Sequence, residues 1–371
     1  MKRIKKGVAT AFAAIIFAGP VAFSQQDTAK SRVDDDGTVH FPNWSVPYSE
    51  LASPEAKKNF IDFSRKFEAQ GKALAADKPR PGETPAERTR RLTDETLMIP
   101  GLNRLRTVFA VDIKPESIGG VQTDVVVPAK GTSPANRNRV LINLHGGGMT
   151  VGARYGGQIE SVPIASLGGI KVITVDYRMA PEWHFPAASE DVAKVYGELL
   201  KSYRPENIGI YGCSAGASLT GQAVAWFQTH DLPRPGAVGM FGFGAIGELV
   251  GDSNYLFTGG KPAPKREKAD GYLAGADVAD PLVSPVRSSS VLKGFPPSLL
   301  ISGTRDLGLS PVLYTHARLV DLGVEADLHV WEGAPHCSYA QPVVDPDVPE
   351  TRQAWKVIIN FFDKHLGNKA K

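Results

Sequence analysis

The sequence predicts an α/β fold with a mainly parallel central sheet covered by helices. From about residue 106 onward, short runs rich in Val, Ile and Leu recur, with room for a helix between each run and the next. Most of these runs are apolar throughout, which is typical of strands that are buried on both faces of a sheet. The 371 residues are enough for one large domain with a smaller accessory region.

The expected elements follow from these runs and from the segments between them. The predicted strands are residues 125–127, 140–144, 172–175, 208–211, 299–301 and 326–331. The predicted helices are residues 157–168, 187–203, 215–230, 310–322 and 349–366. Residues 247–292 are rich in Gly, Pro and charged residues, and they are longer than a connecting loop, so we expect an insertion over the active face.

Two further helices are expected before the sheet. Residues 54–76 predict an amphipathic helix, because three phenylalanines recur at spacings of three and four. A second helix is predicted over residues 86–98, and we expect Pro100 and Gly101 to end it.

The N-terminus has the pattern of a signal peptide. Four basic residues precede an apolar stretch from Gly7 to Phe23, and the small residues that follow suggest cleavage after Ser24. A retained membrane anchor is the alternative, although about 17 apolar residues are at the short limit for a spanning helix. We therefore expect no stable membrane insertion and a periplasmic or secreted protein. The predicted organisation is a signal peptide (1–24), an N-terminal segment (25–105) and a catalytic domain (106–371).

The charge of the chain gives no sign of a nucleic-acid partner. Removal of residues 1–24 takes away four basic residues and no acid, so the formal net charge falls from +3 to −1. The remaining charges of both signs are interspersed, so neither nucleic acid nor an anionic membrane is an expected partner.

A serine nucleophile is predicted at Ser214. The motif Gly212-Cys213-Ser214-Ala215-Gly216 follows a predicted strand and opens a predicted helix. A nucleophilic serine stands on a turn so sharp that the residues two before and two after it carry no side chain. An ordinary N-cap serine in a Gly-rich turn is the alternative interpretation.

A second glycine motif is expected to stabilise negative charge. His145-Gly146-Gly147-Gly148 follows the predicted strand 140–144, where hydrolases with a nucleophile elbow supply part of the oxyanion hole. Backbone N–H groups of Gly147 and Gly148, with that of Ala215, are the expected donors to the oxyanion. We expect His145 to order this loop and not to act as the base.

The expected order of the catalytic residues is serine, acid, histidine, which places the base late in the chain. His336 lies in a loop after the predicted strand 326–331 and is the predicted base. The other histidines lie in predicted helices or strands, near the C-terminus, or outside the expected loop: His40, His184, His230, His316, His329 and His365.

Asp306 is the predicted acid of the site. It follows a predicted buried strand and precedes the helix 310–322, where a carboxylate can hold the imidazole in the correct tautomer. The alternatives are Asp321, Asp327, Glu332 and Asp345.

These motifs, with the segment from Asp176 to Glu182, resemble those of the bacterial carboxylesterases of the hormone-sensitive lipase family. The resemblance covers about residues 106–366. It implies an α/β-hydrolase fold with a cap formed by the helices of residues 40–105, joined by the 247–292 insertion. Such caps narrow the acyl pocket, so the resemblance implies short-chain or small aromatic esters as substrates, with no cofactor and no metal.

Two positions depart from the family pattern. The residue before the nucleophile is usually Asp and the residue after the base is usually Gly, whereas this chain has Cys213 and Cys337, its only cysteines. Because Ser214 and His336 must come within hydrogen-bond reach, the two thiols are expected to be near each other in a compartment that permits disulfides. The hypothesis is a disulfide, and the alternative is two buried thiols.

Ester hydrolysis through an acyl-enzyme is the leading functional hypothesis. A secreted serine peptidase or amidase is the related alternative, and a non-catalytic small-molecule binding module is a more distant one. The natural ester and the oligomeric state are left open by the sequence.

Overall fold

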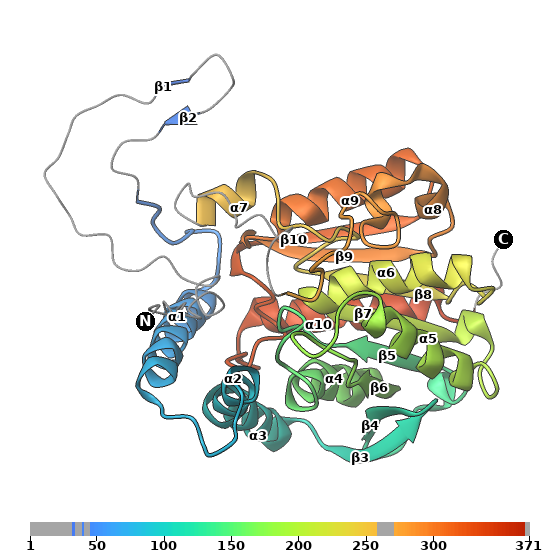
Figure 1. Cartoon of the computed structure of the whole chain (residues 1–371), viewed down its shortest axis with the longest axis horizontal. Helices are drawn as coiled ribbons and strands as arrows, with labels where there is room; N and C mark the ends of the chain where they lie inside the picture. Colours follow the sequence, from blue (N-terminus) through green and yellow to red (C-terminus); the bar gives the residue numbers. More distant parts are fainter. Residues whose placement is uncertain (1–31, 34–38, 41–44, 258–270, 368–371) are drawn as a thin grey trace, which may run out of the picture.

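A central sheet of eight strands organises the molecule (Figure 1). The computed structural model describes residues 32–33, 39–40, 45–257 and 271–367, so the predicted signal peptide lies outside the described residues. The strand order is β10-β9-β8-β7-β5-β6-β4-β3. The strands are β3 (Val111–Ile118), β4 (Val121–Pro128), β5 (Val140–Leu144), β6 (Lys171–Val175), β7 (Ile208–Cys213), β8 (Ala237–Phe241), β9 (Ser298–Arg305) and β10 (Ala326–Pro335).

The predicted fold class is confirmed, since every pairing from β10 to β6 is parallel. Only the pairings of β4 with β6 and of β3 with β4 are antiparallel. β3 and β8 are not among the predicted strands. β3 is an edge strand with many polar residues, and β8 is short and contains Gly239, so neither has a long run of β-branched residues. A separate two-stranded pairing joins β1 (Arg32–Val33) and β2 (Val39–His40).

Helices cover both faces of the sheet and divide the core into two clusters. One cluster contains residues of α5, α6, α8 and α9, and the other contains residues of α3, α4 and α10. Within β5, Ile142 belongs to the first cluster and Leu141 to the second, so the strand is buried on both sides. The helices after β4 are α4 (Tyr155–Gly168), α5 (Ala187–Leu199), α6 (Ala215–Thr229), α7 (Asp252–Phe257), α8 (Ser289–Lys293), α9 (Leu309–Asp321) and α10 (Pro349–His365).

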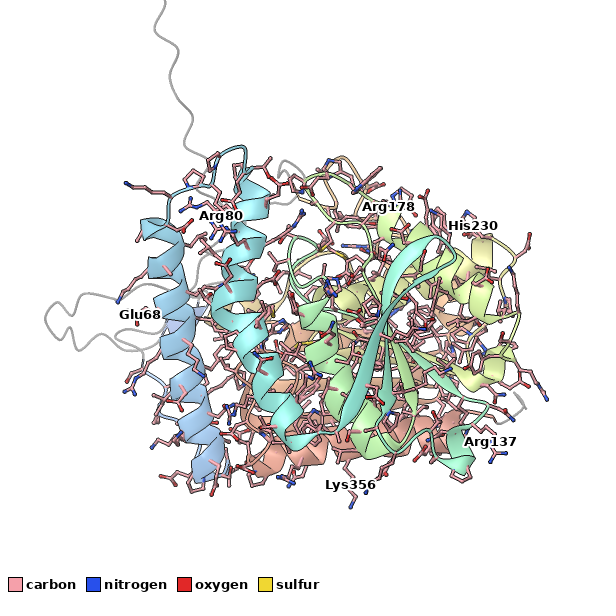
Figure 2. The ribbon with its side chains drawn as sticks, turned by 90° about the horizontal axis from the view of Figure 1, so that it is seen from below. Glu68, Arg80, Arg137, Arg178, His230 and Lys356 are labelled. Atoms are coloured by element: carbon pink, nitrogen blue, oxygen red, sulfur yellow. A yellow bond between two sulfur atoms is a disulfide. The ribbon has the colours of Figure 1, made fainter. Side chains whose placement is uncertain are left out.

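The N-terminal helices lie together along one flank of the sheet domain, where α1 runs beside α2 and α3 (Figure 2). α1 (Pro54–Ala76) has the predicted bounds and α2 (Pro85–Thr93) starts as predicted, but the expected end at Pro100 was wrong. A π-helical segment (Asp94–Met98) continues directly into α3 (Ile99–Val108). Pro100 is tolerated there because it lies at the junction of the π-helical segment and α3, where the regular i→i−4 pattern of hydrogen bonds is already interrupted.

The described part of the 247–292 segment contains α7, most of α8 and a contact with the first turn of α5. In that contact the backbone N–H of Ala188 donates to the hydroxyl of Tyr272 over 2.7 Å. Among the helices of the described residues, none is long and apolar enough to cross a membrane.

Candidate active site

Ser214 stands on the turn between β7 and α6. Its backbone has φ 59° and ψ −116°, a conformation that L-residues rarely adopt. A Cβ atom would lie 2.2 Å from the carbonyl oxygen of Leu144 if placed on Gly212, and 1.7 Å from it if placed on Gly216. The two glycines are therefore required by the close approach of the turn to β5, as the motif predicts.

Tertiary structure brings the predicted base and acid to this serine. The Nε2 atom of His336 lies 2.8 Å from Ser214 Oγ, and its Nδ1 atom lies 2.7 Å from Asp306 Oδ1. The three side chains thus form one hydrogen-bonded line, although 122 residues separate Ser214 from His336 in the chain. This is the arrangement in which an imidazole can take a proton from a hydroxyl group while a carboxylate orients it.

Asp306 is fully buried and is held by two further donors. Its Oδ1 atom accepts the backbone N–H of Gly308 at 2.7 Å, and its Oδ2 atom accepts the hydroxyl of Ser302 at 3.0 Å. On the other side of the pair, Gln341 Nε2 donates to the carbonyl oxygen of His336 at 3.0 Å. These contacts fix the carboxylate and the histidine loop, and none of the three supporting residues was predicted from the sequence.

The charge of Asp306 controls the protonation of His336. Burial alone lowers the pKa of His336, but the charge and the hydrogen bond of Asp306 outweigh it and raise the pKa above 6.5. The imidazole is therefore a stronger base than an isolated histidine.

The loop after β5 lies against the nucleophile. A Cβ atom on Gly146 would be 3.5 Å from Ser214 Cβ, while Gly147 (φ 110°) and Gly148 (φ 64°) have left-handed backbones. Within the described part of the chain, the N–H groups of these last two glycines donate to no protein acceptor. The N–H of Ala215 belongs to the first turn of α6, where such groups have no partner within the helix. None of the three predicted donors therefore has a protein acceptor among the described residues, and Ala215 directly follows Ser214 in the chain.

His145 directly precedes the glycines of this loop and is fully buried. Its ring stacks on that of Tyr177 with 4.2 Å between centroids, and Tyr177 Oη donates to the carbonyl oxygen of His145 at 2.6 Å. Burial lowers the pKa of His145 to about 4, so its ring is neutral at neutral pH. These contacts suit a residue that orders the loop.

The two cysteines are joined in a disulfide, with 6.3 Å between their Cα atoms. The bridge connects Cys213, at the end of β7, with Cys337, which follows His336. Of the two alternatives, two thiols or one bridge, the structure contains the bridge.

The other candidate acids lie away from the imidazole or have other partners. Asp345 pairs with Arg104 at 2.8 Å, Asp321 ends α9, and Asp327 lies near the start of β10. Sequence reasoning also passed over Glu160, whose signal is a single acid within the otherwise apolar centre of α4. Among the described residues, no three His, Cys, Asp or Glu side chains are grouped as metal ligands.

The fold and this site define the class as an α/β protein with a serine on a nucleophile elbow. A family model described as alpha/beta hydrolase fold matches residues 141–340. The chain is 29% identical over 264 residues to an acetyl-hydrolase of Streptomyces hygroscopicus, covering 68% of this chain and 85% of that protein.

Solved structures give the same result. The crystal structure of an esterase named E25 has a TM-score of 0.71 and 30% identity, covering 88% of this chain and 98% of that one. An esterase from the bacterial hormone-sensitive lipase family has a TM-score of 0.67 and 28% identity, covering 85% and 99%. The chain therefore belongs to the alpha/beta hydrolase fold family, in its hormone-sensitive lipase branch, and the predicted family is confirmed.

Proposed function

We propose that this protein is a serine carboxylic ester hydrolase that works through an acyl-enzyme. The observation that carries the proposal is the hydrogen-bonded line from Ser214 through His336 to Asp306. His336 removes the Ser214 proton as Oγ attacks the ester carbonyl, and then gives that proton to the departing alcohol. Water, activated by the same imidazole, hydrolyses the acyl-serine.

The oxyanion of each tetrahedral intermediate is bound by the N–H groups of Gly147, Gly148 and Ala215. Gly147 and Gly148 lie in a glycine-rich loop, and Ala215 lies in the first turn of α6; both positions support this role. Preorganised donors of this kind typically contribute about 3 kcal/mol each to lowering the barrier.

The proposed substrates are short-chain or small aromatic esters. The similarity to an acetyl-hydrolase supports a small acyl group. We assign the helices of residues 40–105 as a cap, supported by Arg90 of α2, which donates to the carbonyl oxygens of Thr150 and Ala180. A cap held this close to the loop restricts the length of the acyl chain.

We further propose that residues 1–24 direct export and are removed, which leaves the enzyme in the periplasm or outside the cell. The basic start and apolar stretch support this assignment. Mass spectrometry of the protein recovered from the periplasm or the medium tests it: an N-terminus near Gln25 is expected, and a retained Met1 would contradict it.

The test of the activity is hydrolysis of p-nitrophenyl acetate, butyrate and octanoate by the wild type and by Ser214→Ala. We expect turnover that depends on Ser214 and that favours acetate or butyrate. Equal rates in both proteins would reject the esterase, and a preference for octanoate would reject the restrictive cap.

A further inference from the structure

Glu160 places a carboxyl group inside the protein, directly beneath the oxyanion loop. It lies in α4 within the buried segment from Ile159 to Ile164, and only 8% of its surface is exposed. Its Oε1 atom accepts the backbone N–H of Gly146 at 2.7 Å, and its Oε2 atom accepts Asn143 Nδ2 at 2.9 Å. A buried acid costs stability unless its hydrogen bonds are satisfied, so its presence there calls for a role.

The contacts of Glu160 extend from the sheet to the nucleophile. Asn143, on β5, also accepts a hydrogen bond from the hydroxyl of Thr174, on β6, at 3.1 Å. At the other end, a Cβ atom on Gly146 would lie 3.5 Å from Glu160 Oε1 and 3.5 Å from Ser214 Cβ. The carboxyl group and the nucleophile therefore contact the same residue of the loop.

We propose that Glu160 is a positioning residue for ester hydrolysis, whose carboxyl group anchors the N–H of Gly146 so that the N–H groups of Gly147 and Gly148 point at the oxyanion. This role rests on the proposed esterase function. Glu160, on α4, accepts a hydrogen bond from the N–H of Gly146 in this loop. Tyr177, which follows β6, stacks on His145 and donates to its carbonyl oxygen. The donors that follow Gly146 are then preorganised before the substrate binds.

The charge of this carboxyl group gives a readout that a purely structural residue would lack. Burial raises the pKa of Glu160 to about 8, against the hydrogen bonds from Asn143 and from the backbone of Gly146 and Cys213. The acid is thus mostly neutral at pH 7 and becomes an anion above pH 8. An anion beneath the loop opposes the negative charge that develops on the substrate, so kcat falls as Glu160 ionises.

Apart from the proposed base His336, the other titratable groups around Glu160 keep their charge over this pH range. Burial lowers the pKa of His145 to about 4 and raises the pKa of Tyr177, Tyr211 and Tyr339, so all four are neutral when Glu160 ionises. His336 loses its proton to become the active base, which raises activity with pH and so acts in the opposite direction to Glu160.

The first experiment compares Glu160→Ala with Ser161→Ala, a control at the next position of α4, which is also buried. We expect Glu160→Ala to lower kcat by about 10- to 100-fold with KM changed less than about threefold. Binding of a trifluoromethyl ketone, whose hemiketal oxyanion resembles the intermediate, should weaken by the same factor as kcat. The control should change neither. Unchanged ketone binding in Glu160→Ala would overturn the proposal.

The second experiment uses Glu160→Gln, whose amide oxygen can still accept the N–H of Gly146 but which cannot ionise. If Glu160→Ala does not fold, this variant alone tests whether Glu160 positions the loop. The substitution requires that the amide of Asn143 reverse its orientation and that the hydroxyl of Thr174, which now donates to Asn143 Oδ1, accept from the amide instead. We expect a kcat near that of the wild type at pH 7 and loss of the alkaline decline near pH 8. An identical alkaline decline in Glu160→Gln would overturn the role of Glu160, whereas absence of Ser214-dependent turnover in the wild type would instead overturn the esterase function.

Discussion

The disulfide between Cys213 and Cys337 joins the residue before the proposed nucleophile to the residue after the proposed base. The two cysteines are 124 residues apart in the chain, so the bridge closes a large loop and holds the histidine segment against the elbow. It occupies the two positions at which the family resemblance leads us to expect an Asp and a Gly, and it adds a covalent link between the elbow and the histidine loop.

Removal of the bridge is expected to destabilise the protein more than it impairs chemistry. For Cys213→Ala combined with Cys337→Ala, chain entropy predicts a loss of about 3 to 5 kcal/mol in the free energy of unfolding. We expect kcat to fall only a few-fold, because Asp306 and Gln341 still hold His336. Urea unfolding and steady-state kinetics measure the two effects. In Ellman titration of denatured, unreduced protein, no free thiol is expected, and two would show that the bridge is not formed.

Replacement of Asp306 by Asn should leave the fold intact and nearly abolish turnover. The amide keeps the shape of the carboxylate but no longer accepts the Nδ1–H of His336 reliably, so the wrong imidazole tautomer faces Ser214. We expect kcat to fall by about 10³- to 10⁴-fold. Asp321→Asn, at the exposed end of α9, is the matched control and should be as active as the wild type. A loss of less than tenfold in Asp306→Asn would argue for another acid.

The pH dependence of kcat/KM should report the raised pKa of His336. The base is active when neutral, so activity falls as the pH drops through this pKa, and the acid limb should have its midpoint above pH 6.5. In Asp306→Asn the charge is gone and burial alone acts on the imidazole, so the residual activity should show a midpoint below 6.5. An unchanged midpoint in Asp306→Asn would show that the acid limb of the pH profile does not report the ionisation of His336 beside Asp306.

Arg90 is expected to couple the N-terminal helices to the oxyanion loop. Its guanidinium group donates to Thr150 O at 2.8 Å and Ala180 O at 2.7 Å, and it pairs with Glu182 at 2.7 Å. Arg90→Ala should destabilise the protein by about 1.5 to 3 kcal/mol and raise KM several-fold, because two carbonyl groups lose a charged donor.

The control for Arg90 is Arg80→Ala, which removes another arginine of the same helical region (Figure 2). Arg80 pairs with Glu95 at 2.9 Å, and both side chains are exposed, so little change in stability or KM is expected. Equal effects of the two variants in thermal unfolding and kinetics would contradict the assigned contact between cap and loop.

The sequence by itself determined the elements whose constraints are local. The elbow can be predicted because its turn brings Gly212 and Gly216 against the backbone of Leu144, so neither position can carry a side chain. The apolar strands can be predicted because a strand that is buried on both faces of a sheet needs a continuous run of hydrophobic residues. The start of α1 also follows from its neighbours, since the hydroxyl of Ser53 caps it and Pro54 opens it.

Tertiary structure alone decided which distant residues meet. The hydrogen bonds of His336 join it to Asp306 and Ser214, which lie 30 and 122 residues away in the chain. The contact of Glu160 with Gly146 joins α4 to the loop after β5, and no local pattern distinguishes Glu160 from other polar residues. The same holds for β3, whose exposed edge needs few apolar residues, and for Pro100, which a π-helical segment places at a tolerant position. Local sequence therefore determines where side chains are excluded and which segments are apolar. The position of each hydrogen-bond donor at the site depends instead on how the whole sheet and its helices pack.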